Sequence, residues 1–114
     1  MFDPLDFLKL AEELKYSPSD EAKLRTSISR AYYSAFLKAR EWLKPQTKKL
    51  YKGPEAHEDV QDDLELYKGR GLKDKLSTLR RHRNVVDYNL LKVVKETEAS
   101  YVIFLSKEIV KGCS

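Results

Sequence analysis

Apolar residues recur at helical spacing through most of the chain, between short polar segments that contain proline or glycine. A helix turns once in about 3.6 residues, so apolar positions three and four apart fall on one face. The pattern predicts helices at residues 4–16, 20–44, 55–67 and from 72 onward. The last stretch has no Gly or Pro before Gly112, which predicts one continuous helix or two that break softly near Asn89. We therefore expect residues 1–114 to form one all-α domain, an up-and-down bundle of four to five helices with a long central second helix.

Helix starts and ends can be placed from a few residues. Asp3 before Pro4 suits a first turn, because an aspartate oxygen caps free N–H groups and proline presets φ. Residues 17–21 repeat this signal before the second helix. Pro45 predicts that this helix ends near Lys44, since proline lacks the N–H that continues a helix. The first helix is expected to bury an i, i+3, i+4, i+7 stripe: Phe7, Leu10, Ala11 and Leu14.

Residues 44–54 hold two prolines, Gly53 and four lysines, a composition that predicts the main exposed loop. Leu50 and Tyr51 are expected to anchor it. The next helix carries one stripe, made of His57, Val60, Leu64 and Tyr67, and Gly69 and Gly71 predict its end. On that stripe His57 fits a structural histidine better than a catalyst.

The second predicted helix has a wide apolar face, which is typical of a central helix with several neighbours. Its members are Leu24, Ile28, Ala31, Ala35, Ala39 and Trp42, widened by Tyr32, Phe36 and Leu43. The three alanines stand at every fourth position and form a low ridge that another helix could approach closely. A second subunit is one candidate for that neighbour, and Ala35→Glu would then produce monomers.

An arginine interrupts the apolar stripe of the helix after residue 72. The stripe is Leu72, Leu76, Leu79, Val86 and Leu90. Arg83 lies only about 20° from its centre, and Asp87 follows four residues later on the same flank. One interpretation is a buried intrahelical ion pair. The other is a functional arginine, because a guanidinium binds phosphate bidentately, with Arg80 and Arg81 adding positive charge.

Several hydrogen-bonding side chains fall in the second helix where burial is expected: Arg25, Thr26, Ser27, Ser29, Arg30, Tyr32 and Tyr33. Buried polar groups need partners. They either connect this helix to the later helices or line the same cleft as Arg83. His82 adjoins Arg83 and therefore points about 100° away from it on a helix.

Composition narrows the chemistry further. The net charge is +4, but 18 acids interleave with 22 bases, so an acidic or nucleic-acid partner is only weakly indicated. Cys113 is the one cysteine, which excludes an internal disulfide and a cysteine-based zinc site and favours a reducing compartment. No secretion signal or membrane span is evident, so we expect a cytoplasmic protein with no membrane partner. No metal site, cofactor, phosphate loop or serine triad is indicated.

Two segments make the chain resemble the HEPN family of small helical domains. Residues 22–36, with the paired Tyr32 and Tyr33 followed by Phe36, look like the family's tyrosine-containing helix. Residues 83–88, Arg-Asn-Val-Val-Asp-Tyr, are similar to the Arg-x-x-Ala-Asp-Tyr form of its late helix. The resemblance covers nearly the whole chain and identifies it with the minimal, nucleotidyltransferase-associated type.

The resemblance implies a homodimer that binds a minimal nucleotidyltransferase, as in toxin–antitoxin pairs, and RNA or nucleotide at a cleft around Arg83. Many members are metal-independent ribonucleases with an Arg-x4-His motif, but Tyr88 stands at the histidine position here. A ribonuclease and a non-catalytic helical adaptor are the alternatives. The candidate catalytic residues are Arg83, Asp87 and Tyr88; the candidate RNA- or nucleotide-binding residues are Arg80, Arg81, Arg83, Asn84 and Tyr88; the supporting residues are Arg25, Ser29, Tyr32 and Tyr33.

Overall fold

The computed structural model describes residues 1–17 and 20–114, so Pro18 and Ser19 of the second predicted helix start lie outside it. The described chain is all-helical, with no strand among those residues. Its elements are α1 Leu5–Lys15, α2 Glu21–Thr47, α3 Ala56–Lys68, α4 Arg70–Tyr88 and α5 Glu96–Gly112. The prediction of an all-α bundle with a long second helix is confirmed.

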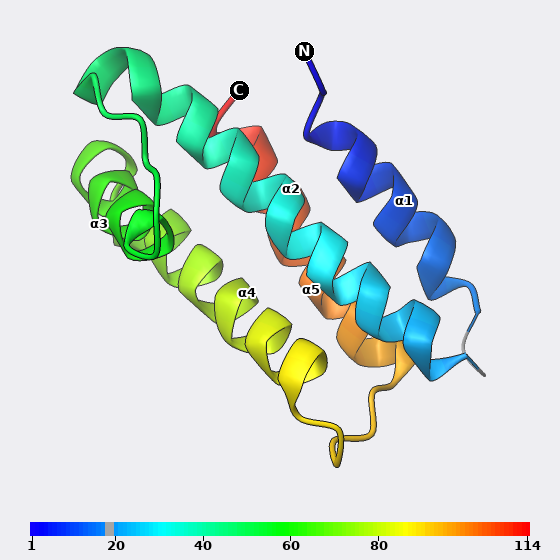
Figure 1. The fold of residues 1–114 in the computed structure, drawn as a ribbon. Helices are drawn as coiled ribbons and strands as arrows, with labels where there is room; N and C mark the ends of the chain where they lie inside the picture. The colour runs from blue at the N-terminus through cyan, green and yellow to red at the C-terminus, as the bar shows by residue number, and fades with distance from the viewer. Residues whose placement is uncertain (18–19) are drawn as a thin grey trace.

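Helix α2 is the centre of the bundle and packs against each of the other four helices. Figure 1 shows α1 along one side of α2, α3 and α4 along the other, and α5 behind. The domain is elongated, with extents of 43 × 25 × 25 Å. None of its described helices is long and apolar enough to cross a membrane.

Both predicted helix starts have an aspartate that accepts a backbone N–H. Asp3 accepts from Leu5 at 3.0 Å, and Asp20 accepts from Lys23 at 3.1 Å. These bonds satisfy first-turn donors that have no partner within the helix. Helices α1 and α2 accordingly begin close to the predicted residues.

The predicted end of α2 at Lys44 is wrong, because the helix continues through Pro45 to Thr47. A proline in the last turn removes only one backbone hydrogen bond. The helix tolerates this loss because few residues follow the proline. Side chains also support the final turn: Gln46 donates to the carbonyl oxygen of Trp42 and Thr47 to that of Leu43. The helix then ends at Lys48, whose φ is 63°.

The loop after α2 is anchored by Tyr51 and not by Leu50. Tyr51 is buried, and its hydroxyl donates to Asp63 at 2.7 Å, whereas Leu50 is 61% exposed. The α3 stripe is confirmed in part, since Val60 and Leu64 are buried while Tyr67 is 43% exposed. Gly69, with φ 90°, separates α3 from α4, a conformation that glycine adopts without strain.

The sequence pattern predicted two leucines in the core that are exposed in the structure. Leu10 of α1 is 38% exposed, and Leu8 is buried in its place together with Ala11, because α1 contacts both α2 and α5 through that face. Leu90 is 84% exposed, since α4 ends at Tyr88 and the helical stripe ends with it. The chain thus breaks near Asn89, as one of the two alternatives predicted.

The alanine ridge of α2 lies inside the single chain. Ala31, Ala35 and Ala39 are completely buried. Ser106 of α5 donates to the carbonyl oxygen of Ala31 at 2.7 Å, so α5 covers at least this part of the ridge. The interpretation of the ridge as a subunit interface is therefore wrong, because its neighbours are helices of the same chain.

Candidate functional site

Arg83 projects from α4 onto the two tyrosines of α2. Its guanidinium carbon lies 5.3 Å from the ring centroid of Tyr32 and 5.3 Å from that of Tyr33. Both distances fall within the range of cation–π attraction. Arg83 is only 9% exposed, so the inward position predicted from helical phase is confirmed.

The guanidinium of Arg83 is poorly paired for a buried charge. Its nearest carboxylate oxygen, on Asp87, is 3.9 Å away, and the buried Nε has no hydrogen-bond partner among the described residues. The buried Nε of the half-buried Arg80 is in the same condition. Burying a cation is costly unless it is paired and hydrogen-bonded. The aromatic rings compensate for only part of that cost.

His57 joins this cluster from α3. Its ring stacks on Phe36 with centroids 4.4 Å apart, and its Nδ1 is hydrogen-bonded to the hydroxyl of Tyr32. Burial, followed by the positive charges of Arg80 and Arg83, lowers the pKa of His57 from its ordinary value. A neutral imidazole therefore lies beside two guanidinium groups at neutral pH. Burial also raises the pKa of Tyr32, so its hydroxyl keeps its proton at neutral pH.

The position of His57 beside Arg83 has no direct signal in the sequence. Its phase on α3 correctly predicted a position against apolar residues, but the residues facing it belong to α2 and α4. A histidine more than twenty residues from either motif is linked to Arg83 only by the packing of three helices. We define the Arg83 cluster as Tyr32, Tyr33, His57, Arg80 and Arg83.

A hollow of about 370 Å³ lies next to the cluster, between α2 and α4. Its lining is Arg25, Thr26, Ser29, Arg30, Val86 and Asp87. Ser29 donates to Asp87 at 3.4 Å, and the guanidinium of Arg30 lies over the rings of Phe7 and Tyr33. The hollow and the cluster together contain more arginines than carboxylates, so the field there is positive.

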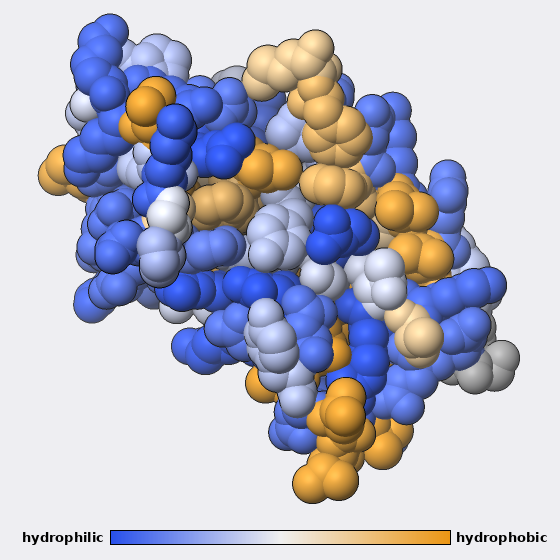
Figure 2. Space-filling view, in the orientation of Figure 1, coloured by the Kyte–Doolittle hydropathy of each residue, from blue (hydrophilic) through white to orange (hydrophobic). Residues whose placement is uncertain are grey.

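The polar residues of α2 divide between the two predicted roles. Ser27 donates to the carbonyl oxygen of Ala11 at 2.6 Å, and Arg25 donates to that of Val86 at 2.6 Å, so both connect helices. Ser29 lines the hollow, and Tyr33 lies under Arg83. Figure 2 shows the side of the molecule on which α2 and α4 lie. Hydrophilic side chains predominate over the middle of these two helices, and hydrophobic side chains gather at the lower end, over the α4–α5 loop.

Three predicted binding residues lie away from the cluster. Tyr88, the last residue of α4, is 75% exposed, and Asn84 is exposed as well. Arg81 lines a different hollow with His82 on another flank of α4. The structure thus brings together Arg80, Arg83, Tyr32 and Tyr33, with Asp87 and Ser29 at the edge, and does not bring Arg81 to them.

Comparison with known proteins identifies the family of the chain but assigns it no activity. The chain is similar to the uncharacterized protein MJ0628 of Methanocaldococcus jannaschii, with 37% identity over 134 residues, 94% of this chain and 80% of the archaeal protein. The chain belongs to the family of MJ0628. No family profile and no solved structure matches the chain. Any function assigned to this family member therefore depends on its own residues.

Proposed function

We propose that this member of the MJ0628 family is a HEPN-type domain that binds phosphate groups of RNA or a nucleotide at the Arg83 cluster. In this proposal it acts as the dimeric partner of a minimal nucleotidyltransferase. The observation that supports binding is the buried, poorly paired guanidinium of Arg83 on two tyrosine rings. The dimer and the partner enzyme rest on the resemblance of residues 22–36 and 83–88 to HEPN motifs.

The chemistry of the cluster suits a phosphate better than an apolar or cationic ligand. A guanidinium binds phosphate oxygens bidentately, and a neutral imidazole can donate to a third oxygen. The tyrosine rings hold Arg83 in place, which reduces the entropy lost when a ligand binds.

A binding experiment with single-stranded RNA tests the proposal. Arg83→Gln should weaken binding by about tenfold or more, since a charge-assisted bidentate contact contributes about 1.5–3 kcal/mol. Arg70→Gln is the matched control, because Arg70 is an exposed arginine in the first turn of the same helix. Equal affinities in wild type, Arg80→Gln and Arg83→Gln would reject the proposal and leave the non-catalytic adaptor.

The assembly is tested separately from RNA binding. Light scattering of the purified chain should give the mass of a dimer, and co-expression with a minimal nucleotidyltransferase should give a co-purifying complex. If the chain is a monomer at all concentrations and still binds RNA, the proposed phosphate site stands and the proposed HEPN-type assembly is rejected.

A second candidate function, a ribonuclease, is favoured by one observation. Tyr88 cannot replace a histidine base near neutral pH without a large depression of its pKa from about 10. The structure brings His57 to Arg83 instead, in its neutral form. Purified protein incubated with RNA in EDTA tests this: cleavage that is lost in Arg83→Gln and His57→Gln but kept in Tyr88→Phe supports a ribonuclease based on His57. No cleavage under any condition rejects it.

A further inference from the structure

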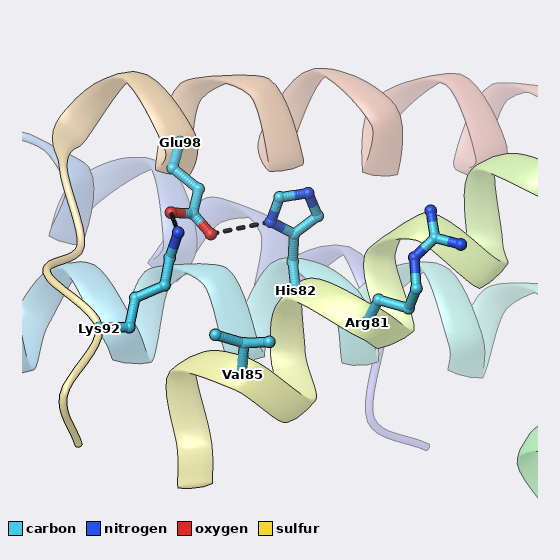
Figure 3. A pocket seen from close by; sticks show the side chains of 5 residues that line it. All are labelled: Arg81, His82, Val85, Lys92 and Glu98. Carbon is cyan, nitrogen blue, oxygen red and sulfur yellow. Dashed lines mark hydrogen bonds and ion pairs between the residues drawn. The ribbon is translucent and has the colours of Figure 1, made fainter. Parts of the chain in front are cut away.

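A second hollow, of about 310 Å³, lies between α4, α5 and the loop that joins them. Its lining is Arg81, His82, Val85, Lys92 and Glu98. In Figure 3 the imidazole of His82 lies between the carboxylate of Glu98 and the guanidinium of Arg81, with its second nitrogen on the side away from Glu98. None of these residues belongs to the Arg83 cluster.

Glu98 holds two of the basic side chains in position. One carboxylate oxygen lies 2.8 Å from Nδ1 of His82, and the other lies 3.3 Å from Nζ of Lys92. The side chain of Glu98 is only 13% exposed. A carboxylate that accepts from Nδ1–H fixes the neutral tautomer and leaves Nε2 free to take a proton. Glu98 therefore holds the His82 ring in one orientation, with Nδ1 hydrogen-bonded to the carboxylate and Nε2 free.

The cationic groups of this hollow outnumber its single carboxylate. Arg81 donates to Thr78 at 3.1 Å and has no carboxylate within ion-pair distance among the described residues. The ring of Tyr101 from α5 meets that of His82 edge to face, 5.9 Å between centroids. Further along the two helices Lys75 and Glu108 pair with each other. The charges that face His82 are thus Arg81, Lys92 and Glu98, with a net positive sum before His82 is protonated.

We propose that this hollow binds a small phosphate monoester and takes up a proton on His82 as it does so. Arg81 supplies the guanidinium that binds two phosphate oxygens, and Nε2 of His82 donates to a third once it is protonated. The proton bound is taken from solvent, and no covalent bond changes. The hollow is at the lower end of the size range of ligand pockets, which suits a phosphorylated sugar or nucleoside better than a polymer.

Sulfate is a suitable probe for the proton linkage, because its charge is constant between about pH 6 and pH 8, where histidine titrates. We expect sulfate to bind wild-type protein about tenfold more tightly at pH 6 than at pH 8, a free-energy difference of about 1.4 kcal/mol. His82→Gln keeps an N–H for Glu98 and should lose this pH dependence. Arg81→Gln should weaken binding at both pH values, whereas Lys75→Gln, the matched control, should not.

The source of the phosphate is distinguished by two further ligands at one pH. Adenosine 5′-monophosphate should compete with sulfate at least as well as a 5′-phosphorylated RNA oligonucleotide does. Equal sulfate affinity at both pH values, or unchanged binding in Arg81→Gln and His82→Gln, would overturn the proposal. Sulfate binding that is lost only in Arg83→Gln would also overturn it, while supporting the separate phosphate site at the Arg83 cluster.

Discussion

The guanidinium of Arg25 donates to the carbonyl oxygen of Val86 at 2.6 Å and so joins α2 to the last turn of α4. The same group donates to the carbonyl oxygens of Asn89 and Lys92 and pairs with Glu21. Carbonyl groups at the end of a helix have no partner within it, and a cation there also interacts favourably with the helix dipole. Arg25 therefore fixes the end of α4 and the following loop, on which both hollows depend.

Arg25→Met should lower the free energy of unfolding by about 2–4 kcal/mol, because it removes charge-assisted hydrogen bonds and leaves partly buried carbonyl groups without a partner. Urea denaturation followed by circular dichroism measures the change. Thr26→Ala is the control, since this exposed neighbour bonds only to its own helix, and its effect should be within about 0.5 kcal/mol. Equal stabilities of the two variants would show that Arg25 does not fix the loop.

Arg83→Met should leave the free energy of unfolding within about 1 kcal/mol of wild type, or raise it. Replacement of a buried, imperfectly paired charge by an apolar side chain of similar length is often neutral or stabilising, even though the cation–π contacts are lost. The same denaturation experiment tests this. A loss of more than about 2 kcal/mol would mean that Arg83 is needed for folding, and would weaken the argument that its burial serves a ligand.

The pattern of the sequence predicted most of the fold because each helix carries its own signals. Asp20 caps α2, Gly69 separates α3 from α4, and the phase of α4 turns Arg83 inward. Errors arose where the outcome depends on other helices. Pro45 is tolerated because side chains support the last turn of α2, and Leu90 is exposed because α4 ends two residues before it.

The candidate site was predictable where its residues lie in one of the two sequence motifs. Arg83 was found from the spacing of α4, and Tyr32 and Tyr33 were named from the motif in α2. His57 was not found, since its approach to Arg83 requires α3 to fold back over α2. The pairing of His82 with Glu98 was missed for the same reason, because it joins α4 to α5 across 16 residues. Contacts between helices are not encoded in the periodicity of either one.

The stability of the domain should fall as the pH is lowered below about 6.5, the ordinary pKa of histidine in an unfolded chain. Burial and the charges of Arg80 and Arg83 lower the pKa of His57 in the folded state. Between the two pKa values the unfolded chain binds more protons, so the free energy of unfolding decreases with decreasing pH. The decrease should level off below the folded-state pKa.

Denaturation at several pH values, combined with an NMR titration of the His57 imidazole, measures this effect. Arg80→Gln removes one cause of the shift and should move the pKa of His57 back toward its ordinary value. The carboxyls of Glu41 and Asp63 have pKa values below their ordinary range, so their effects appear at lower pH. A His57 that titrates at or above its ordinary pKa in wild type would contradict the arrangement described for the cluster.

Ala35→Glu should unfold the domain and not merely separate subunits. Ala35 is completely buried on the α2 ridge, which is covered within one chain, so a glutamate there overpacks the core and buries a charge. A loss of more than about 3 kcal/mol in the free energy of unfolding is expected. Lys23→Glu is the matched control, because it places the same residue in the exposed first turn of α2, where an acid is favourable. Light scattering and circular dichroism together decide the outcome. If wild type is a dimer and the Ala35→Glu variant is a folded monomer, the ridge is part of the subunit interface after all.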